Sequence, residues 1–220
     1  MVEVSVSILN VKDDKAIQTL YNLETSGINY FHIDVMDGSF VPNLACGMKM
    51  IHGLKGVADL VFDVHLMVNE PVRFVKRMQE AGADVISVHY EACSNVAETL
   101  KEIKQCGIRA GIVLNPETSA EVLTEEIWKL ADVIQVMTVH PGRDGQHFIE
   151  DTLDKIKDIR RRSTDTGEWK DIEVDGSINC GNIGKVIKAG ANIIVSGKAL
   201  FNGNLAENIA NMKQQAAMEE

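Results

Sequence analysis

Apolar runs of strand length alternate with amphipathic segments of helix length along the whole chain. In the amphipathic segments, apolar residues recur at helical spacing, as Val96, Leu100 and Ile103 do. Strict alternation with short connections favours a parallel sheet, and eight such repeats let the sheet close on itself. The sequence therefore predicts an α/β fold, a single (β/α)8 TIM barrel that forms one domain over residues 1–220. The eight predicted strands lie at residues 4–9, 30–35, 60–66, 85–89, 109–114, 133–139, 172–174 and 193–196.

Glycines mark the places where predicted helices return to strands. Gly27, Gly82, Gly107 and Gly190 each follow a helical segment and precede an apolar run. Glycine is favoured there because the residue after a helix often takes a left-handed conformation. No linker or low-complexity stretch divides the repeats. Only the tail, residues 213–220, is expected to fray.

Composition and charge exclude several classes of protein. A chain of 220 residues with 45% hydrophobic residues can bury a sizeable core, whereas a net charge of -10 disfavours nucleic acid and anionic membranes as partners. The first residues lack a basic n-region, and no stretch approaches the roughly 20 apolar residues of a membrane span. A cytoplasmic location is therefore expected. The four cysteines form no C-x-x-C pair, which favours reduced thiols over a zinc knuckle or a disulfide framework.

Four potential metal ligands fall at or near the ends of predicted strands: His32, Asp34, His65 and Asp175. His32 and Asp34 are two residues apart, so in a strand both side chains point to the same face. The carboxyl ends of barrel strands are where enzymes of this fold build their active sites. Two imidazoles and two carboxylates suit a divalent transition metal and leave positions for substrate oxygens. Any one of them alone fits a satisfied polar core residue better, but convergence of four favours a metal site.

Long motifs in this chain resemble those of the ribulose-phosphate 3-epimerase family. The segment HIDVMDGSFVPN at residues 32–43 resembles the family's first signature, and DVHLMV at 63–68 resembles its second. EVDG at 173–176 resembles the third, while SVSIL at 5–9 and IVSG at 194–197 are also similar to the family. The resemblance therefore spans essentially the whole chain.

The resemblance implies a (β/α)8 barrel that inverts C3 of a phosphorylated ketose. It implies that His32, Asp34, His65 and Asp175 hold one divalent metal ion, for which zinc, iron(II), cobalt and manganese are all suitable. Inversion beside a ketone requires removal of a proton to give an enediolate and return of a proton to the opposite face. By resemblance, Asp34 is the proton acceptor and Asp175 the donor, with the roles exchanged in the reverse direction.

Substrate contacts are expected from several strand ends and loops. Met36, Met67 and Met137 match thioethers that surround the intermediate in the family, although inward core methionines are an open alternative. Where the family has Gly-Phe-Gly-Gly in a loop, this chain has GRDG at 142–145, and Asp144 would repel a phosphate if it pointed inward. Arg143 and Lys198 are expected to offset that charge. The predicted substrate-binding residues are Ser7, Met36, His65, Met67, Met137, Gly142, Arg143, Asp144, Gly145, Gly176, Ser177, Gly197 and Lys198.

Other polar residues have two interpretations each. His89 is expected to be a supporting core residue, and Asp37 either orders the loop after its strand or contacts substrate. Asp63 and Glu173 share the inward faces of their strands, where they either orient the ligands or form buried ion pairs.

The leading substrate is D-ribulose 5-phosphate, converted to D-xylulose 5-phosphate. D-Allulose 6-phosphate is the alternative, because NPET at 115–118, MTV at 137–139 and DGSIN at 175–179 resemble the hexulose branch more. From other classes, a phosphate-barrel lyase and a non-catalytic sugar-phosphate sensor are less favoured, since neither explains the two-histidine, two-aspartate set. The expected partner is a small phosphorylated ketose, and the sequence leaves open a homo-oligomer.

Overall fold

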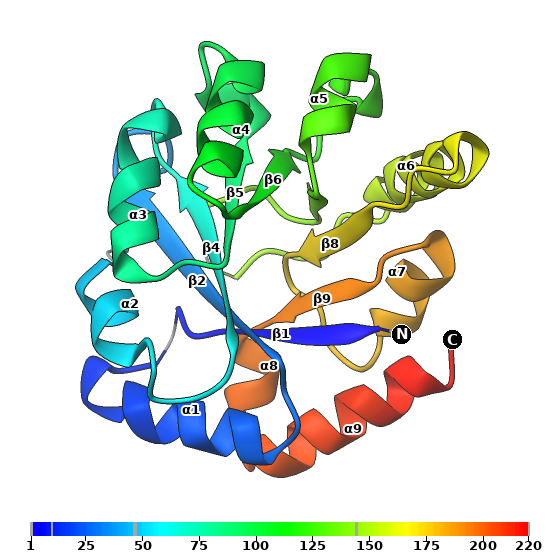
Figure 1. Cartoon of the computed structure of the whole chain (residues 1–220). Coiled ribbons are helices and arrows are strands. Elements are labelled where there is room, and N and C mark those ends of the chain that lie inside the picture. Colours follow the sequence, from blue (N-terminus) through cyan, green and yellow to red (C-terminus); the bar gives the residue numbers. More distant parts are fainter. Residues whose placement is uncertain (1, 10, 46–47, 144, 220) are drawn as a thin grey trace.

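Eight parallel strands form a closed barrel in a computed structural model that describes residues 2–9, 11–45, 48–143 and 145–219 (Figure 1). Around the barrel the strands follow chain order, and β1 pairs with both β2 and β9, which closes the ring. The predicted fold class is confirmed. The strands are β1 (Glu3–Ser7), β2 (Tyr30–Asp37), β4 (Val61–Met67), β5 (Val85–His89), β6 (Arg109–Leu114), β7 (Val133–Met137), β8 (Asp171–Asp175) and β9 (Ile193–Ser196).

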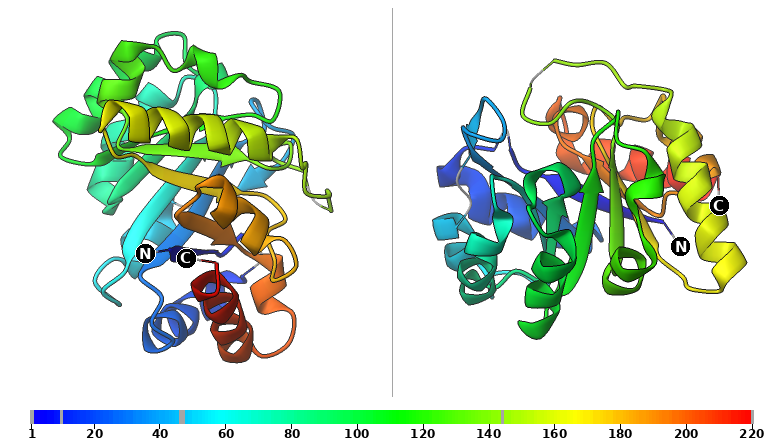
Figure 2. Two further views of the ribbon diagram at one scale, coloured as in Figure 1. Left: turned by 90° about the vertical axis from the view of Figure 1, so that its right-hand side faces the viewer. Right: turned by 90° about the horizontal axis from the view of Figure 1, so that it is seen from above.

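Helices cover the outside of this barrel, and the loops extend from its ends (Figure 2). The four predicted helix-terminal glycines all have positive φ, between 68° and 117°. None of the helices in the described ranges combines the length and the apolar character needed to cross a membrane. The α-helices are α1 (Ala16–Thr25), α2 (Met48–Leu54), α3 (Val75–Ala81), α4 (Val96–Gln105), α5 (Glu125–Leu130), α6 (Thr152–Thr166), α7 (Ile183–Ala189), α8 (Lys198–Phe201) and α9 (Leu205–Ala217).

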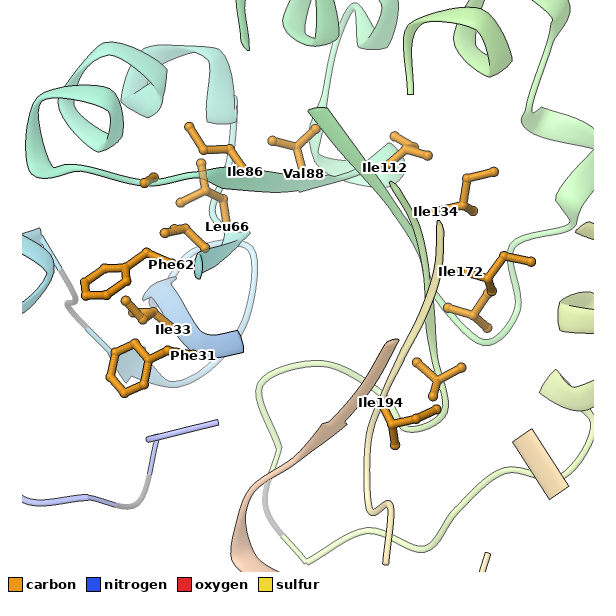
Figure 3. Packing of buried hydrophobic residues seen from close by; sticks show 14 of the residues in the cluster. Phe31, Ile33, Phe62, Leu66, Ile86, Val88, Ile112, Ile134, Ile172 and Ile194 are labelled. Carbon is orange, nitrogen blue, oxygen red and sulfur yellow. The ribbon is translucent and has the colours of Figure 1, made fainter. Parts of the chain in front are cut away.

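The main hydrophobic core lies between the barrel and its helices. Outward-facing strand residues fill it, and they alternate with the inward-facing polar residues of the same strands. Fully burying an aliphatic or aromatic side chain of this size contributes about 1.5–3 kcal/mol. The core residues labelled in Figure 3 are Phe31, Ile33, Phe62, Leu66, Ile86, Val88, Ile112, Ile134, Ile172 and Ile194, none more than 1% exposed.

Several expectations about the ends of elements are wrong. β1 and β7 each end two residues before the predicted end of their strand. β2 runs to Asp37 because its last residues pair antiparallel with a short strand that the sequence did not predict, β3 (Leu44–Ala45). The tail does not fray over its first residues, because α9 continues to Ala217 and buries Met212 and Ala216. Lys213 also donates to the carbonyl of Gly27 at 2.8 Å, which ties the helix to the end of α1.

Candidate active site

Sheet register brings the four predicted ligands together inside the barrel. Asp34 on β2 is aligned with His65 on β4, and His32 is aligned with Ser7, the last residue of β1. Asp175 ends β8, which is separated from β2 by β9 and β1. Both histidines are fully buried, whereas 17% of the Asp175 side chain is exposed. The site therefore lies at the carboxyl end of the barrel, with one carboxylate open to its mouth.

The donor atoms of this cluster lie at distances that suit one metal ion. His32 Nε2 is 3.5 Å from Asp34 Oδ1 and 3.9 Å from Asp175 Oδ2. His65 Nδ1 is 3.3 Å and 3.5 Å from the same two oxygens. A tetrahedron with metal–ligand bonds of roughly 2.1 Å has edges of about 3.4 Å. In the described part of the chain, His32 Nε2 is buried without a hydrogen-bond partner. The four residues could therefore hold a metal ion.

The electrostatics of the cluster also favour a cation. Burial lowers the pKa of His32, but Asp63 and Asp34 outweigh it and raise the pKa well above its usual value. Burial also lowers the pKa of His65, but hydrogen bonds to Asp175 and Asp34 outweigh burial and raise the pKa above its usual value. For Asp34 burial raises the pKa, while His32 and His65 lower it further and hold it below its usual value. Without a metal ion, protons on the imidazoles supply the positive charge that the carboxylates require.

A second acidic layer lies behind His32. The Nδ1 of His32 donates to Asp63 Oδ2 at 2.7 Å and lies 3.6 Å from Glu173 Oε1. Burial and the neighbouring Asp63 raise the pKa of Glu173 well above its usual value, which favours the neutral form of Glu173. Among the described residues neither acid pairs with a lysine or arginine. Asp63 therefore orients His32, and it forms a buried ion pair with that ring when His32 is protonated.

A cavity of about 140 Å³ opens above the carboxylates. Asp34 and Asp175 line it together with Met36, Met67 and Met137, which are between 2% and 6% exposed. Met36 and Met67 also pack against Val41. The three thioethers therefore serve both as packing and as an apolar wall. Of the other predicted contacts, Ser7, Gly142, Arg143, Gly197 and Lys198 also line this cavity.

Two flanking polar residues stabilise loops or ligands. Ser7 Oγ donates to Asp34 Oδ2 at 2.9 Å, which fixes the orientation of that carboxylate. Asp37 accepts from the backbone N–H groups of Ser39, Phe40 and Asn69 at 2.8–2.9 Å. Asp37 thus orders the loops after β2 and β4, which is the first of its two predicted roles.

A larger open groove of about 930 Å³ continues from the cavity, and Arg143, Asp175, Gly197 and Lys198 line both. Gly145 and Ser177 line the groove, and Arg143 and Lys198 are exposed. Asp144 lies outside the described residues. Gly176 has φ 131°, and a Cβ there would come within 2.8 Å of the Val139 N. Gly176 is buried, and its conformation sets the path of the chain after β8.

The sequence did not identify two residues that organise this end of the barrel. The Gln146 side chain donates to the carbonyls of His140 and Arg143 at 2.5 Å and 2.9 Å. The backbone carbonyl of Gln146 accepts from Ser177 Oγ at 2.7 Å, so Gln146 joins the loops after β7 and β8. Glu91, which follows β5, approaches His89 Nδ1 at 3.4 Å. Neither residue lies on the periodic face of a helix or strand, so the sequence pattern did not predict these contacts.

Comparisons with known proteins agree on one family. The profile of the "Ribulose-phosphate 3 epimerase family" matches residues 3–201. A ribulose-phosphate 3-epimerase of Bacillus subtilis is 42% identical over 203 residues, which cover 91% of this chain and 93% of the relative. The Escherichia coli protein of the same name is 42% identical over 178 residues, which cover 80% and 79%. The chloroplastic ribulose-5-phosphate-3-epimerase of Arabidopsis thaliana is 41% identical over 213 residues, which cover 96% and 75%.

Solved structures of other barrels are also similar. A 3-hexulose-6-phosphate synthase superposes with a TM-score of 0.73 at 17% identity and covers 97% of this chain and 99% of its own. A 3-keto-L-gulonate-6-phosphate decarboxylase of Vibrio cholerae gives 0.72 at 14% identity, with 100% of both chains covered. At such identities these likenesses show the barrel fold alone. The sequence relatives show more, because they are about 40% identical to this chain over most of its length. The chain belongs to the ribulose-phosphate 3-epimerase family.

Proposed function

We propose that this chain is a metal-dependent ketose-phosphate 3-epimerase that interconverts D-ribulose 5-phosphate and D-xylulose 5-phosphate. One observation carries the proposal. Asp34 and Asp175 come from strands separated by two others, yet their ligand atoms lie within a cluster no more than 4.8 Å across at the floor of the cavity. Inversion at C3 requires a proton acceptor on one face of that carbon and a proton donor on the other, and two carboxylates facing one cavity can fill these roles.

The two carboxylates differ in a way that suits this exchange. Asp34 is held ionised by the adjacent histidines and oriented by Ser7, so it is ready to accept the C3 proton. Asp175 is partly exposed toward the cavity, where it can return a proton to the opposite face. A divalent ion held by His32, Asp34, His65 and Asp175 would act as a Lewis acid that stabilises the negative charge on the substrate oxygens.

The methionine wall limits the access of water to the enediolate. Met36, Met67 and Met137 offer apolar, polarisable surface without acidic protons. A proton delivered by water at random could reach either face of C3 and give either epimer. The wall therefore leaves proton transfer to Asp34 and Asp175.

The groove beside the cavity is the proposed site for the phosphate. Barrels of this type commonly bind phosphate through loops after their last two strands. In this chain those loops contribute Ser177, Gly197 and Lys198, and Arg143 approaches from the loop after β7. Two exposed cations beside the groove would add charge-assisted contacts to the backbone donors.

The test is an epimerisation assay of the purified protein with D-ribulose 5-phosphate and D-allulose 6-phosphate side by side. We expect a higher kcat/KM for the pentulose, because the relatives at about 40% identity carry ribulose-phosphate names. A higher value for the hexulose would move the assignment to the other branch, which the segments at 115–118, 137–139 and 175–179 resemble more. Binding of either sugar without turnover would indicate a sensor, and cleavage of the sugar between C3 and C4 into two shorter carbonyl compounds would indicate a lyase.

A further inference from the structure

We propose that Glu91 is a positioning residue that acts through His89 to keep the Nδ1 of His65 free of a proton and available to a metal ion. The inference rests on the proposed metal site and concerns residues to which that site gives no role. His89 is fully buried, and Glu91 lies at the surface end of the same segment. Together they connect a ligand in the barrel interior to the loop after β6.

The two nitrogens of His65 face different partners. Nδ1 lies 3.3 Å from Asp34 Oδ1 and 3.5 Å from Asp175 Oδ2, toward the proposed ion, and the amide N–H of Gln135 also approaches it at 3.3 Å. Nε2 lies 2.8 Å from Nε2 of His89. The centroids of the two rings are 4.9 Å apart, which is close to the 2.8 Å between the nitrogens plus one ring radius on each side. The two ring planes differ by 27°. The two nitrogens therefore point at each other nearly in the ring planes, as a strong hydrogen bond requires.

This contact fixes the protons on both rings. A neutral imidazole carries one N–H and one bare nitrogen, so His65 can bind a metal through Nδ1 only if its proton is on Nε2. That proton is donated to Nε2 of His89, which must then be bare. The proton of His89 is consequently on Nδ1, which faces Glu91 Oε2 at 3.4 Å. A carboxylate only accepts hydrogen bonds, so Glu91 favours this tautomer of His89 over the other.

Glu91 is itself held in place by the loop after β6. Its Oε1 accepts from the backbone N–H of Asn115 at 2.9 Å and from the hydroxyl of Thr118. These contacts leave Oε2 directed at His89. Burial raises the pKa of Glu91, but hydrogen bonds from His89, Thr118 and Asn115 outweigh it and lower the pKa to about 2. The carboxylate is therefore charged at neutral pH.

The other histidine of the site, His32, is also oriented by a carboxylate, but without a second histidine between them. His32 turns Nε2 toward the ion and donates its far N–H directly to Asp63 at 2.7 Å. His65 reaches a carboxylate only through His89. If His89 were only a packing residue, an apolar side chain would fill its place without burying two polar nitrogens. Hydrogen-bonded partners of this kind raise the basicity of a metal-binding imidazole and fix its orientation.

The experiment compares zinc affinity, measured by competition with a chromophoric chelator, and the visible spectrum of the cobalt(II) form. His89→Leu removes the acceptor for His65, and we expect it to weaken zinc binding about 10–100-fold. His89→Gln retains an amide oxygen that can accept the same proton and should recover most of that affinity. Glu91→Gln keeps the volume of the side chain and removes its charge. Like His89→Leu, it should weaken zinc binding, and it should alter the cobalt spectrum.

Asp132→Asn is the matched control. Asp132 also accepts a backbone N–H, that of Ala110 at 2.9 Å, but at the opposite end of the barrel. It should leave zinc affinity unchanged. The positioning role is wrong if the zinc affinity of Glu91→Gln equals that of Asp132→Asn and the zinc affinity of His89→Leu equals that of wild type.

A second measurement needs no variant. In the zinc-loaded wild type labelled with ¹⁵N-histidine, long-range ¹⁵N–¹H spectra should show His65 protonated at Nε2 and His89 at Nδ1. The opposite tautomer of either ring overturns the inference even if a variant fails to fold. A wild type that neither binds zinc nor epimerises either sugar phosphate would instead overturn the proposed function. Tight zinc binding and activity with unaffected variants would overturn only this inference.

Discussion

Each buried acid of the barrel interior has its own means of neutralisation. Asp34 faces two imidazoles, and Asp63 accepts from His32. Burial and Asp63 raise the pKa of Glu173 well above its usual value, which favours its neutral form. Sequence alternation places Asp63 and Glu173 on the inward faces of their strands. It does not predict this pKa shift, since the shift depends on contacts between β2, β4 and β8.

Asp175→Asn tests the assignment of the proton carriers. The substitution keeps the shape of the side chain and removes its ability to exchange a proton with C3. We expect kcat to fall about 10²–10⁴-fold, the usual contribution of general acid–base catalysis. Because Asp175 is also a proposed ligand, metal content must be measured by elemental analysis in the same sample. Near-normal turnover in a metal-loaded variant would contradict the assignment, as would wild-type product that carries no solvent deuterium at C3.

Glu91 should also make stability depend on pH. Its pKa in the folded state is about 2, below the ordinary glutamate value of 4.5, so the folded protein binds fewer protons there than the unfolded chain does. Its stabilising contribution is complete above pH 4.5 and is lost as pH falls from 4.5 toward 2. In urea unfolding, wild type should exceed Glu91→Gln in stability at pH 7, and the difference should shrink below pH 4.5. A difference that stays constant from pH 7 to pH 3.5 would contradict this.

The sequence predicted those helices and strands whose formation follows from the apolar pattern of their own residues. The eight long strands are buried on both sides, so each is a continuous apolar run or an apolar–polar alternation. β3 has two residues and exists only because it pairs with Met36 and Asp37. Gln146 is similarly invisible in the sequence, because its function is to join two loops that meet only in the folded barrel.

Arg143→Ala and Lys198→Ala test the contribution of the loop after β7 and of α8. Both cations are exposed beside the groove, so each substitution should raise KM for the phosphosugar while changing kcat little. Each should also weaken the dependence of KM on salt, because screening acts on charged contacts. Lys157→Ala, on the outer face of α6 beside Asp154, removes the same charge away from the groove and is the control. If neither variant changes KM relative to Lys157→Ala, backbone donors alone bind the phosphate.

For the whole molecule, the sequence predicted the architecture and the four proposed ligands better than it predicted their support. Ligand identity was visible because His32, Asp34, His65 and Asp175 interrupt or end apolar runs. Their support comes from residues such as His89, which resembles any other buried strand residue until its neighbours are known. Closure of the barrel brings strands distant in sequence, β2 and β8, to the same proposed metal site.

Because a bound ion would join β2, β4 and β8, metal binding should stabilise the entire barrel. A ligand that binds only the folded state adds about 2.7 kcal/mol at a free concentration 100 times its Kd. For a protein of this length that corresponds to a rise in Tm of roughly 5–11 °C. Exhaustive chelation should remove both the rise and the epimerase activity, and zinc, cobalt or manganese should restore them. His65→Ala should show no rise with zinc, whereas His52→Ala, an exposed histidine on α2, should show the full rise. Full activity in protein shown to be metal-free, or an equal rise in His65→Ala, would mean that this cluster is not the site through which a metal supports the fold and the reaction.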